Sequence, residues 1–123
     1  MRLAQLYDGQ DADGNWFFDP DRPRITDPAE RERVANFLRR GMVILRVPGS
    51  DLDRLEPDNG PVVPISTLTD GTWIWGAALR YYVETHGIAP EPDFYAHIVA
   101  HEYVPTQPDE PTWRAALEQL RIG

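Results

Sequence analysis

The sequence predicts an α+β domain in which a mainly antiparallel sheet has its helices packed on one side. A central hairpin pattern supports this prediction, because residues 65–69 and 72–75 are rich in β-branched and aromatic residues and flank Asp70-Gly71. Strand-like runs dominate the first half of the chain, and segments with helical periodicity dominate the second half. The predicted order is β-β-α-β-β-β-α-α-α. A length of 123 residues fits a single domain, residues 1–123.

The first elements are two short strands. Residues 2–7 (RLAQLY) alternate between polar and apolar positions, which is the period of a half-buried strand, and Asp8-Gly9 ends the pattern. A polar turn cluster follows at residues 10–15. Residues 16–18 (WFF) are then most simply the return strand of a hairpin.

A helix is predicted over residues 28–40. Asp27 can cap its free amides and Pro28 suits its first position, while Gly41 supplies a left-handed cap at its end. The apolar run that follows, residues 42–47 (MVILRV), predicts a buried strand.

Residues 48–61 (PGSDLDRLEPDNGP) are predicted to form the longest loop. One interpretation is an ordinary solvated connector. The other is a contact surface for a protein partner, made by the four carboxylates Asp51, Asp53, Glu56 and Asp58.

The chain then passes from the central hairpin into helices. Asp-Gly at positions 70 and 71 predicts a type I′ turn. Residues 76–86 are predicted to be helical with Gly87 as the C-cap, and a second helix runs from Pro92 to about residue 102. Asp109 is predicted to cap a last helix that extends to about residue 121.

Composition narrows the function classes. The net charge is −8, from 20 acidic residues and 12 basic ones, and there is no cysteine. A negative field repels phosphate backbones, so no nucleic-acid partner is expected, whereas a basic protein partner would be steered toward the chain. No apolar run approaches membrane-spanning length, so no membrane partner and a cytoplasmic location are expected. The chain is expected to be a monomer or a homodimer.

Histidines and carboxylates provide the alternative, an enzyme. His97 and His101 are four residues apart on a predicted helix, so both rings face the same side. Helical zinc motifs place a glutamate beside the first histidine, and here that position holds isoleucine. A small-ligand or metal-dependent enzyme would need His97, His101 and Glu84 to converge in one pocket. No metal and no cofactor are predicted.

Aromatic residues gather around the hairpin and the helices that follow it. We expect Trp75, Leu79 and Tyr82 to belong to the core. Trp73, Tyr81 and Tyr103 could instead form part of a protein interface, because tryptophan and tyrosine beside acidic groups are typical of interface hot spots.

Residues 64–103 contain a series of short motifs: Thr-Asp-Gly-Thr-Trp-Ile-Trp, then Ala-Leu, Tyr-Tyr and His-Gly, and finally Pro-x-Phe-x-x-His-Ile. The combination resembles a pattern in small bacterial proteins in which a TDGxWxW hairpin leads into an ALxYY helix. Several of those look like immunity or accessory proteins of polymorphic toxin systems. The resemblance implies a non-catalytic protein that covers the active site of a toxin.

Two hypotheses follow. In the first, the chain is a protein-binding module of the immunity or adaptor type, and its contact residues are expected to be Asp51, Asp53, Glu56, Asp58, Trp73, Tyr81 and Tyr103. In the second, it is the enzyme that uses His97, His101 and Glu84.

Overall fold

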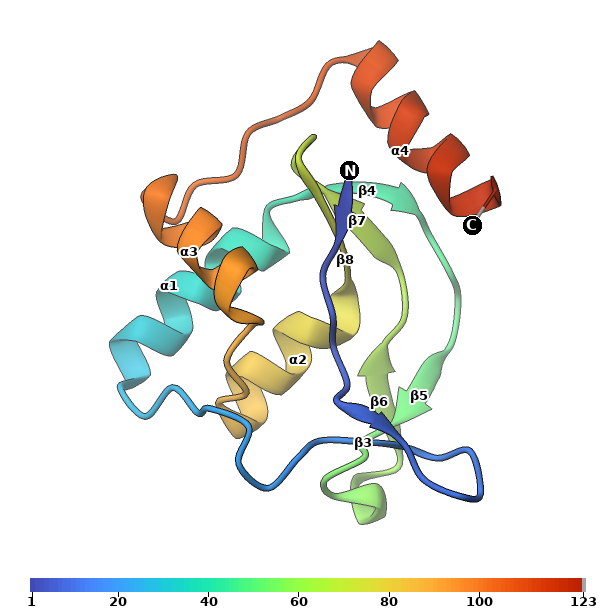
Figure 1. The fold of residues 1–123 in the computed structure, drawn as a ribbon, viewed down its shortest axis with the longest axis vertical. Coiled ribbons are helices and arrows are strands. Elements are labelled where there is room, and N and C mark those ends of the chain that lie inside the picture. The colour runs from blue at the N-terminus through green and yellow to red at the C-terminus, as the bar shows by residue number, and fades with distance from the viewer. Residues whose placement is uncertain (123) are drawn as a thin grey trace.

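The computed structural model describes residues 1–122 and has a four-stranded sheet at its centre (Figure 1). The strand order is β1-β8-β7-β4, where β1 is Arg2–Leu3, β4 is Met42–Leu45, β7 is Thr67–Thr69 and β8 is Trp73–Gly76. The pairs β4–β7 and β7–β8 are antiparallel, and β1 runs parallel to β8. Four α-helices accompany the sheet, which confirms the predicted α+β class.

The predicted central hairpin is confirmed as β7 and β8, with Thr69 opposite Ile74. Its turn is not of type I′, because Gly71 (φ 92°) has a positive φ and Asp70 does not. The Asp70 carboxylate instead accepts hydrogen bonds from the amides of Thr72 and Trp73, both at 2.9 Å. An aspartate at the start of a turn commonly accepts hydrogen bonds from the amides that follow it, and here these bonds stabilise the turn.

The prediction of a long loop over residues 48–61 is wrong. The segment contains β5 (Ser50–Leu52) and a short 3₁₀ helix, η1 (Pro57–Asn59), and β5 pairs with β6 (Pro61–Pro64). Val47 also donates from its amide to the Ser66 hydroxyl at 3.0 Å, between the β4–β7 and β5–β6 pairings. Residues 42–69 therefore form one long, bent hairpin with η1 at its tip (Figure 1).

The early strands also differ from the predictions. The return strand β3 (Trp16–Phe17) pairs with β2 (Gly9–Gln10) and not with the first strand, which joins β8 through a contact distant in sequence. The strand predicted over residues 42–47 is shorter and lies at the sheet edge, where Val43 and Leu45 are exposed. A side chain at an edge lacks a neighbour on one side, which explains this exposure.

Three helix boundaries follow their predicted caps, but the prediction that Gly41 caps the first helix in a left-handed conformation is wrong, because the C-cap is Arg40 with φ −92° and Gly41 has no positive φ. In α1 (Pro28–Arg39), Asp27 accepts a hydrogen bond from the amide of Ala29, and in α2 (Ala77–His86) the C-cap Gly87 is left-handed with φ 70°. The third helix, α3, is Pro92–Ala100, and Asp109 caps α4 (Glu110–Ile122) by accepting from the Thr112 amide at 3.0 Å. Local capping chemistry thus marks the starts of α1 and α4 and the end of α2, whereas α2 and α3 begin without a side-chain cap.

The inner face of the sheet packs against α1 and α3. Trp75 is buried there, with its ring 5.7 Å from that of Phe37 and 5.4 Å from that of Phe94. Its indole N–H donates to the Leu38 carbonyl at 3.1 Å. A Cβ on Gly41 would lie 2.3 Å from the Trp75 ring, so the chain can pass this ring only because position 41 is glycine.

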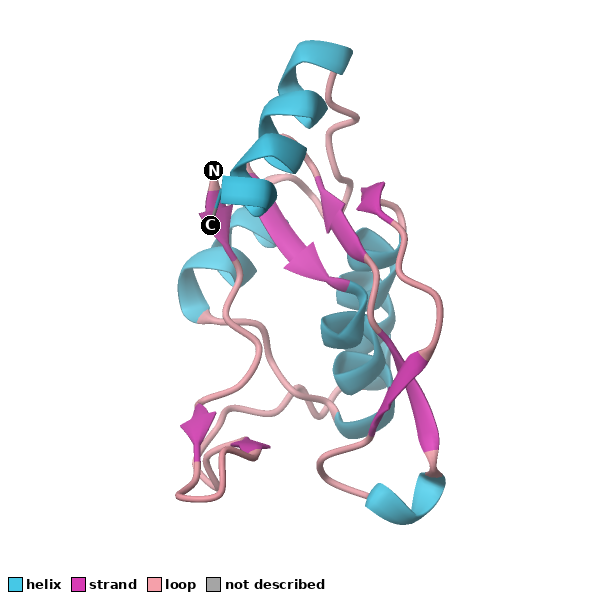
Figure 2. Cartoon of the chain, turned by 90° about the vertical axis from the view of Figure 1, so that its right-hand side faces the viewer, coloured by secondary structure: helices cyan, strands magenta, loops and turns pink. Residues whose placement is uncertain are grey.

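The outer face of the sheet carries α4 alone among the helices (Figure 2). The prediction that helices gather on one side therefore describes α1, α2 and α3. The last helix is tied to the first strand by Gln119, whose amide donates to the Met1 carbonyl at 2.8 Å. Ala116 is fully buried in this contact region, and Trp113, Leu117 and Leu120 on the same apolar stripe are partly buried.

Candidate functional site

Two buried aspartates each hold a histidine. The carboxylate of Asp70 accepts the two amides of its turn through Oδ1, and its Oδ2 lies 2.6 Å from Nε2 of His97. The Asp70 side chain is almost fully buried, while 12% of the His97 side chain is exposed. This pair fixes the hairpin turn to α3.

The second pair is formed by Asp53, which is fully buried. Its Oδ1 accepts the amides of Leu55 and Glu56 at 2.8 and 3.0 Å, and its Oδ2 lies 2.7 Å from both the Tyr81 hydroxyl and Nε2 of His86. Burial alone raises the pKa of this carboxyl, but the hydrogen bonds from His86, Tyr81 and the two amides outweigh burial and lower the pKa to about 2. The charged carboxylate thus ties the β5–β6 hairpin to α2.

The two aspartates share one local arrangement, in which one oxygen accepts the amides two and three residues ahead and the other faces a histidine. The first half of this arrangement has a sequence signal, an aspartate at the start of a turn. The histidines are 33 and 27 residues away, so no spacing rule identifies them. Chemically, both pairs join loops to helices by buried, charge-assisted hydrogen bonds.

The four loop carboxylates do not form one exposed surface. Glu56 and Asp58 are exposed, as expected. Asp51 is half-buried and forms an ion pair with Arg54 at 3.2 Å. Asp53 requires a correction, because its carboxylate is fully buried and cannot reach a partner.

The aromatic residues expected at an interface are also divided. Trp73 is buried, with its ring 4.8 Å from that of Phe94, so it belongs to the core. Tyr81 and Tyr103 are half-buried, and each presents part of its ring to solvent. Their hydroxyls are engaged within the fold, by Asp53 and by Glu30.

The structure does not bring His97, His101 and Glu84 together. Glu84 lies on α2 and forms ion pairs with Arg39 of α1 and Arg80 of α2. His101 is engaged elsewhere, since its Nδ1 lies 2.9 Å from the His97 carbonyl. Within residues 1–122, no group of three or more histidine, aspartate or glutamate side chains is arranged to hold a metal ion. The convergence that the enzyme hypothesis required is therefore not found among these side chains.

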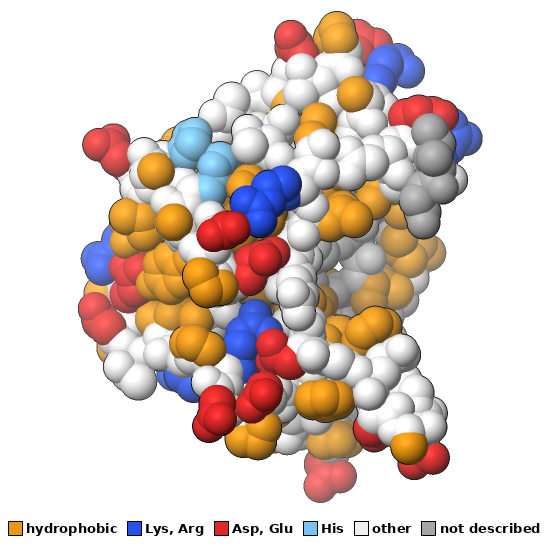
Figure 3. All heavy atoms as spheres, viewed as in Figure 1, with side chains coloured by type: hydrophobic (Ala, Val, Ile, Leu, Met, Phe, Trp, Pro, Cys, Tyr) orange, Lys and Arg blue, Asp and Glu red, His pale blue; other side chains and the backbone are white. Residues whose placement is uncertain are grey.

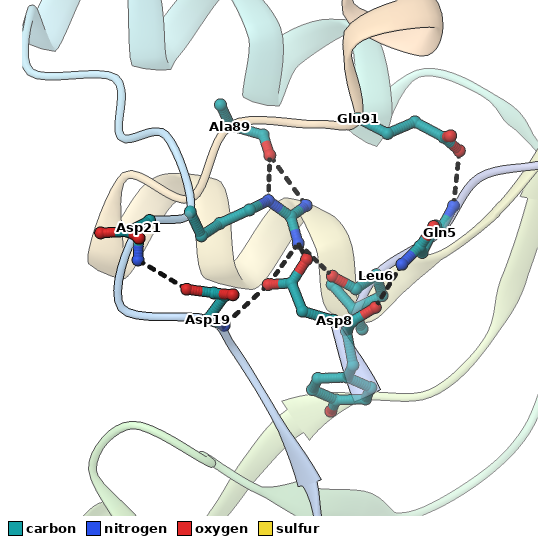
Figure 4. Close-up of polar contacts among 9 residues, drawn as sticks. Gln5, Leu6, Asp8, Asp19, Asp21, Ala89 and Glu91 are labelled. Atoms are coloured by element: carbon teal, nitrogen blue, oxygen red, sulfur yellow. Dashed lines mark hydrogen bonds and ion pairs between the residues drawn. The ribbon is translucent and has the colours of Figure 1, made fainter. Parts of the chain in front are cut away.

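An acidic cleft of about 360 Å³ lies between the segment that follows β1 and the start of α3 (Figure 4). Its lining combines four carboxylates with one guanidinium and several prolines: Gln5, Asp8, Asp19, Asp21, Arg22, Pro23, Pro90, Glu91 and Pro92. The sequence analysis predicts a strand at Gln5 and a helix start at Pro92 and identifies no site among these residues. The sequence signal for the cleft is Asp-Pro-Asp at positions 19–21, which places one carboxylate on each side of a rigid proline.

Arg22 forms the base of this acidic cleft. Its Nε and Nη2 donate to the Ala89 carbonyl at 3.1 and 2.9 Å, and its Nη1 donates to the Leu6 carbonyl at 2.7 Å. The same Nη1 forms an ion pair with Asp8 at 3.2 Å, and only 7% of the side chain is exposed. Arg22 therefore joins three distant segments, and its charge is balanced by Asp8.

The remaining carboxylates give the cleft a net negative charge. Asp19 and Asp21 are exposed, and Glu91 is half-buried and accepts the Gln5 amide at 2.7 Å. Because Asp8 offsets Arg22, the other three carboxylates leave a negative site with room for a cationic group. An arginine or lysine side chain of a partner has suitable chemistry for this cleft.

Comparisons with protein families, with curated proteins and with solved structures found no match to this chain. Among the helices of residues 1–122, none has the length and apolar character needed to span a membrane.

Proposed function

We propose that this chain is a non-catalytic, cytoplasmic protein-binding module that acts by stoichiometric contact with a basic protein partner. The acidic cleft carries this proposal, since Asp19, Asp21 and Glu91 surround an arginine whose charge Asp8 already offsets. The net charge of −8 acts in the same direction at longer range. Together they favour a positively charged partner over nucleic acid.

The mechanism has a long-range and a short-range part. The negative field raises the rate of encounter with a basic surface, and this effect weakens as salt shortens the screening length. At contact, an arginine or lysine side chain enters the acidic cleft. The exposed carboxylates Glu56 and Asp58 and the partly exposed rings of Tyr81 and Tyr103 supply further contacts.

Within this class we favour an immunity-type protein, with an adaptor as the other member. The support is the resemblance of residues 64–103 to proteins of polymorphic toxin systems. A protein of this kind neutralises a toxin by covering its active site, which requires only a stable complementary surface.

The test is a pull-down of the tagged protein from a lysate of its source organism, at low and at high salt, followed by mass spectrometry. We expect one stoichiometric basic partner that is lost at high salt. The variant D19N/E91Q/D21N should slow association at low salt by about tenfold or more. The matched control E32Q/E102Q/E110Q removes the same charge from exposed positions outside the cleft and should slow association less.

Two results would contradict the proposal. One is recovery of no partner at either salt concentration. The other is equal association rates for the cleft variant and its control, which would remove the acidic cleft from the mechanism.

A further inference from the structure

Helix α4 covers one part of the outer face of the central sheet and leaves another part exposed (Figure 2). Residues directly opposite each other on neighbouring strands share a face, so Leu3, Ile74 and Thr69 form one row across the sheet. Ile74 and Thr69 are 1% and 0% exposed on the side that carries α4. Leu3, at the end of the same row, is 58% exposed.

The next row of the outer face is open. Thr67 lies opposite both Gly76 and Leu45, and it shares a face with Thr69 because it is two residues away. Gly76 is exposed, and 43% of the Leu45 surface is exposed. We call the surface formed by Leu3, Leu45, Thr67 and Gly76 the open half of the outer face.

This surface lies in a concave setting. Figure 2 shows that α4 crosses the upper part of the sheet, while the β2–β3 hairpin and the β5–β6 hairpin descend on either side. Figure 3 shows a hollow below α4 with hydrophobic side chains around it. The neighbouring elements carry further exposed large hydrophobic residues: Trp16, Phe17, Leu52, Val62 and Ile65. So many exposed apolar side chains on adjoining elements mark an interaction surface.

The half that is already covered shows what kind of segment this face accepts. The last helix lies on the sheet through an apolar stripe that includes Ala116, Leu117 and Leu120, and its other side is exposed. An amphipathic segment of a partner could lie beside it on the open half in the same way.

The charges around the open half of the outer face indicate which kind of partner segment would bind there. Exposed carboxylates lie at the lower end of the two flanking hairpins, Asp11 and Asp13 in the β2–β3 turn and Glu56 and Asp58 around η1. A second copy of this chain would bring another net charge of −8 against them. An amphipathic segment can place its apolar side on the open half of the outer face. Arginine or lysine on its polar side would then complement the carboxylates of the flanking hairpins.

We propose that the open half of the outer face is the docking site for a basic, amphipathic segment of the protein partner, which places its apolar side chains between Leu3 and Leu45. This inference rests on the proposed function and adds the surface and the chemistry of the partner segment.

The first test uses a synthetic probe, a helical peptide with leucines on one side and arginines on the other, titrated into ¹⁵N-labelled protein by NMR. We expect the amide signals of Leu3, Leu45, Thr67 and Gly76 to shift. A second peptide with glutamine in place of leucine keeps the charge and should bind at least about tenfold more weakly. Equal binding of both peptides, or shifts confined to other surfaces, would overturn the inference.

The second test uses variants that change no charge. L3S/L45S removes the two leucines from the open half, and V99S/V104S removes two valines that are 45% and 49% exposed elsewhere. We expect the dissociation constant for the arginine–leucine peptide to rise by about tenfold or more in L3S/L45S and to stay within about twofold in V99S/V104S.

The partner recovered in the pull-down separates the two proposals. If it binds L3S/L45S as tightly as V99S/V104S, the docking surface is wrong while the protein-binding function stands. If the pull-down recovers no partner, the protein-binding function fails and the docking surface fails with it.

Discussion

The two faces of the central sheet differ sharply in how completely they are covered. On the inner face, Leu68, Trp73 and Trp75 are 6%, 3% and 1% exposed beneath α1 and α3. On the outer face, Ile74 and Thr69 of the central strands are buried, but Leu3 and Leu45 on the edge strands β1 and β4 are 58% and 43% exposed. Burial of apolar side chains on the inner face and beneath α4 stabilises the fold, and the open part of the outer face leaves apolar surface that folding does not use.

This difference separates residues that hold the fold from residues available for contact. Sequence composition does not make the distinction, since leucine occurs on both faces, as Leu68 on the inner face and Leu3 and Leu45 on the outer face. Only the packing around each side chain assigns it to one role. Four variants test the separation, from the largest expected loss of stability to the smallest.

Trp75→Ala should be the most damaging change. It removes a large, fully packed side chain and leaves the Leu38 carbonyl without its indole donor. We expect the free energy of unfolding, measured by urea denaturation, to fall by about 3–5 kcal/mol. Trp16→Ala is the matched control, because Trp16 is 46% exposed, and a similar loss there would contradict the assignment of roles.

The buried carboxylate of Asp53 should give the protein an acid-sensitive component of stability. Its pKa falls from the ordinary 3.8 to about 2 on folding, so the folded state binds fewer protons than the unfolded state in this range. The stabilisation is complete above about pH 4 and is lost as the pH falls toward 2, which amounts to about 2 kcal/mol.

The check for Asp53 is a series of denaturation curves between pH 2 and 5. D53N should lack this component of the pH dependence, whereas D58N, at an exposed position, should retain it. An identical pH profile for D53N and the unmodified protein would refute the assigned role of the Asp53 pair.

Ala116→Asp should detach α4 from the outer face. Ala116 is fully buried there, and a carboxylate at this position cannot stay buried without a partner. We expect a loss of about 1–2 kcal/mol and faster amide hydrogen exchange in α4, with unchanged protection in α1 and α2. Global loss of protection would show that α4 is an integral part of the core.

L3S/L45S should have the smallest effect on stability, below about 0.5 kcal/mol for each substitution, because both side chains are largely exposed. Thermal unfolding beside V99S/V104S is the appropriate measurement. A much larger loss in L3S/L45S would mean that the open half of the outer face contributes to folding and is not reserved for a partner.

Local chemistry accounts for the parts of the fold that the sequence predicted correctly. Asp27 with Pro28 marks the start of α1, Gly87 ends α2, and Asp70-Gly71 locates the central hairpin. Each signal acts within a few residues of the structure that it determines, so it can be recognised without knowledge of the rest of the chain.

Apart from the type of the Asp70-Gly71 turn and the cap at Gly41, the errors arose where structure depends on pairing or contacts between separate segments. Residues 48–61 look like a proline-rich acidic loop, and only pairing with residues 61–64 makes residues 50–52 a strand. The Asp53–His86 pair and the Arg22 contacts join segments up to 67 residues apart, so the buried aspartates and the acidic cleft could not be assembled from spacing. The exposed outer face depends on strand register, which the sequence does not specify.

The most direct test of the central claim is amide hydrogen exchange of the protein alone and in complex with its recovered partner. We predict slower exchange in the partner complex at residues 2–5, 42–47 and 64–69, around the open half of the outer face. Protection confined to other segments, such as the start of α3 at the acidic cleft, or no protection at all, would contradict the claim that this half of the sheet binds the partner.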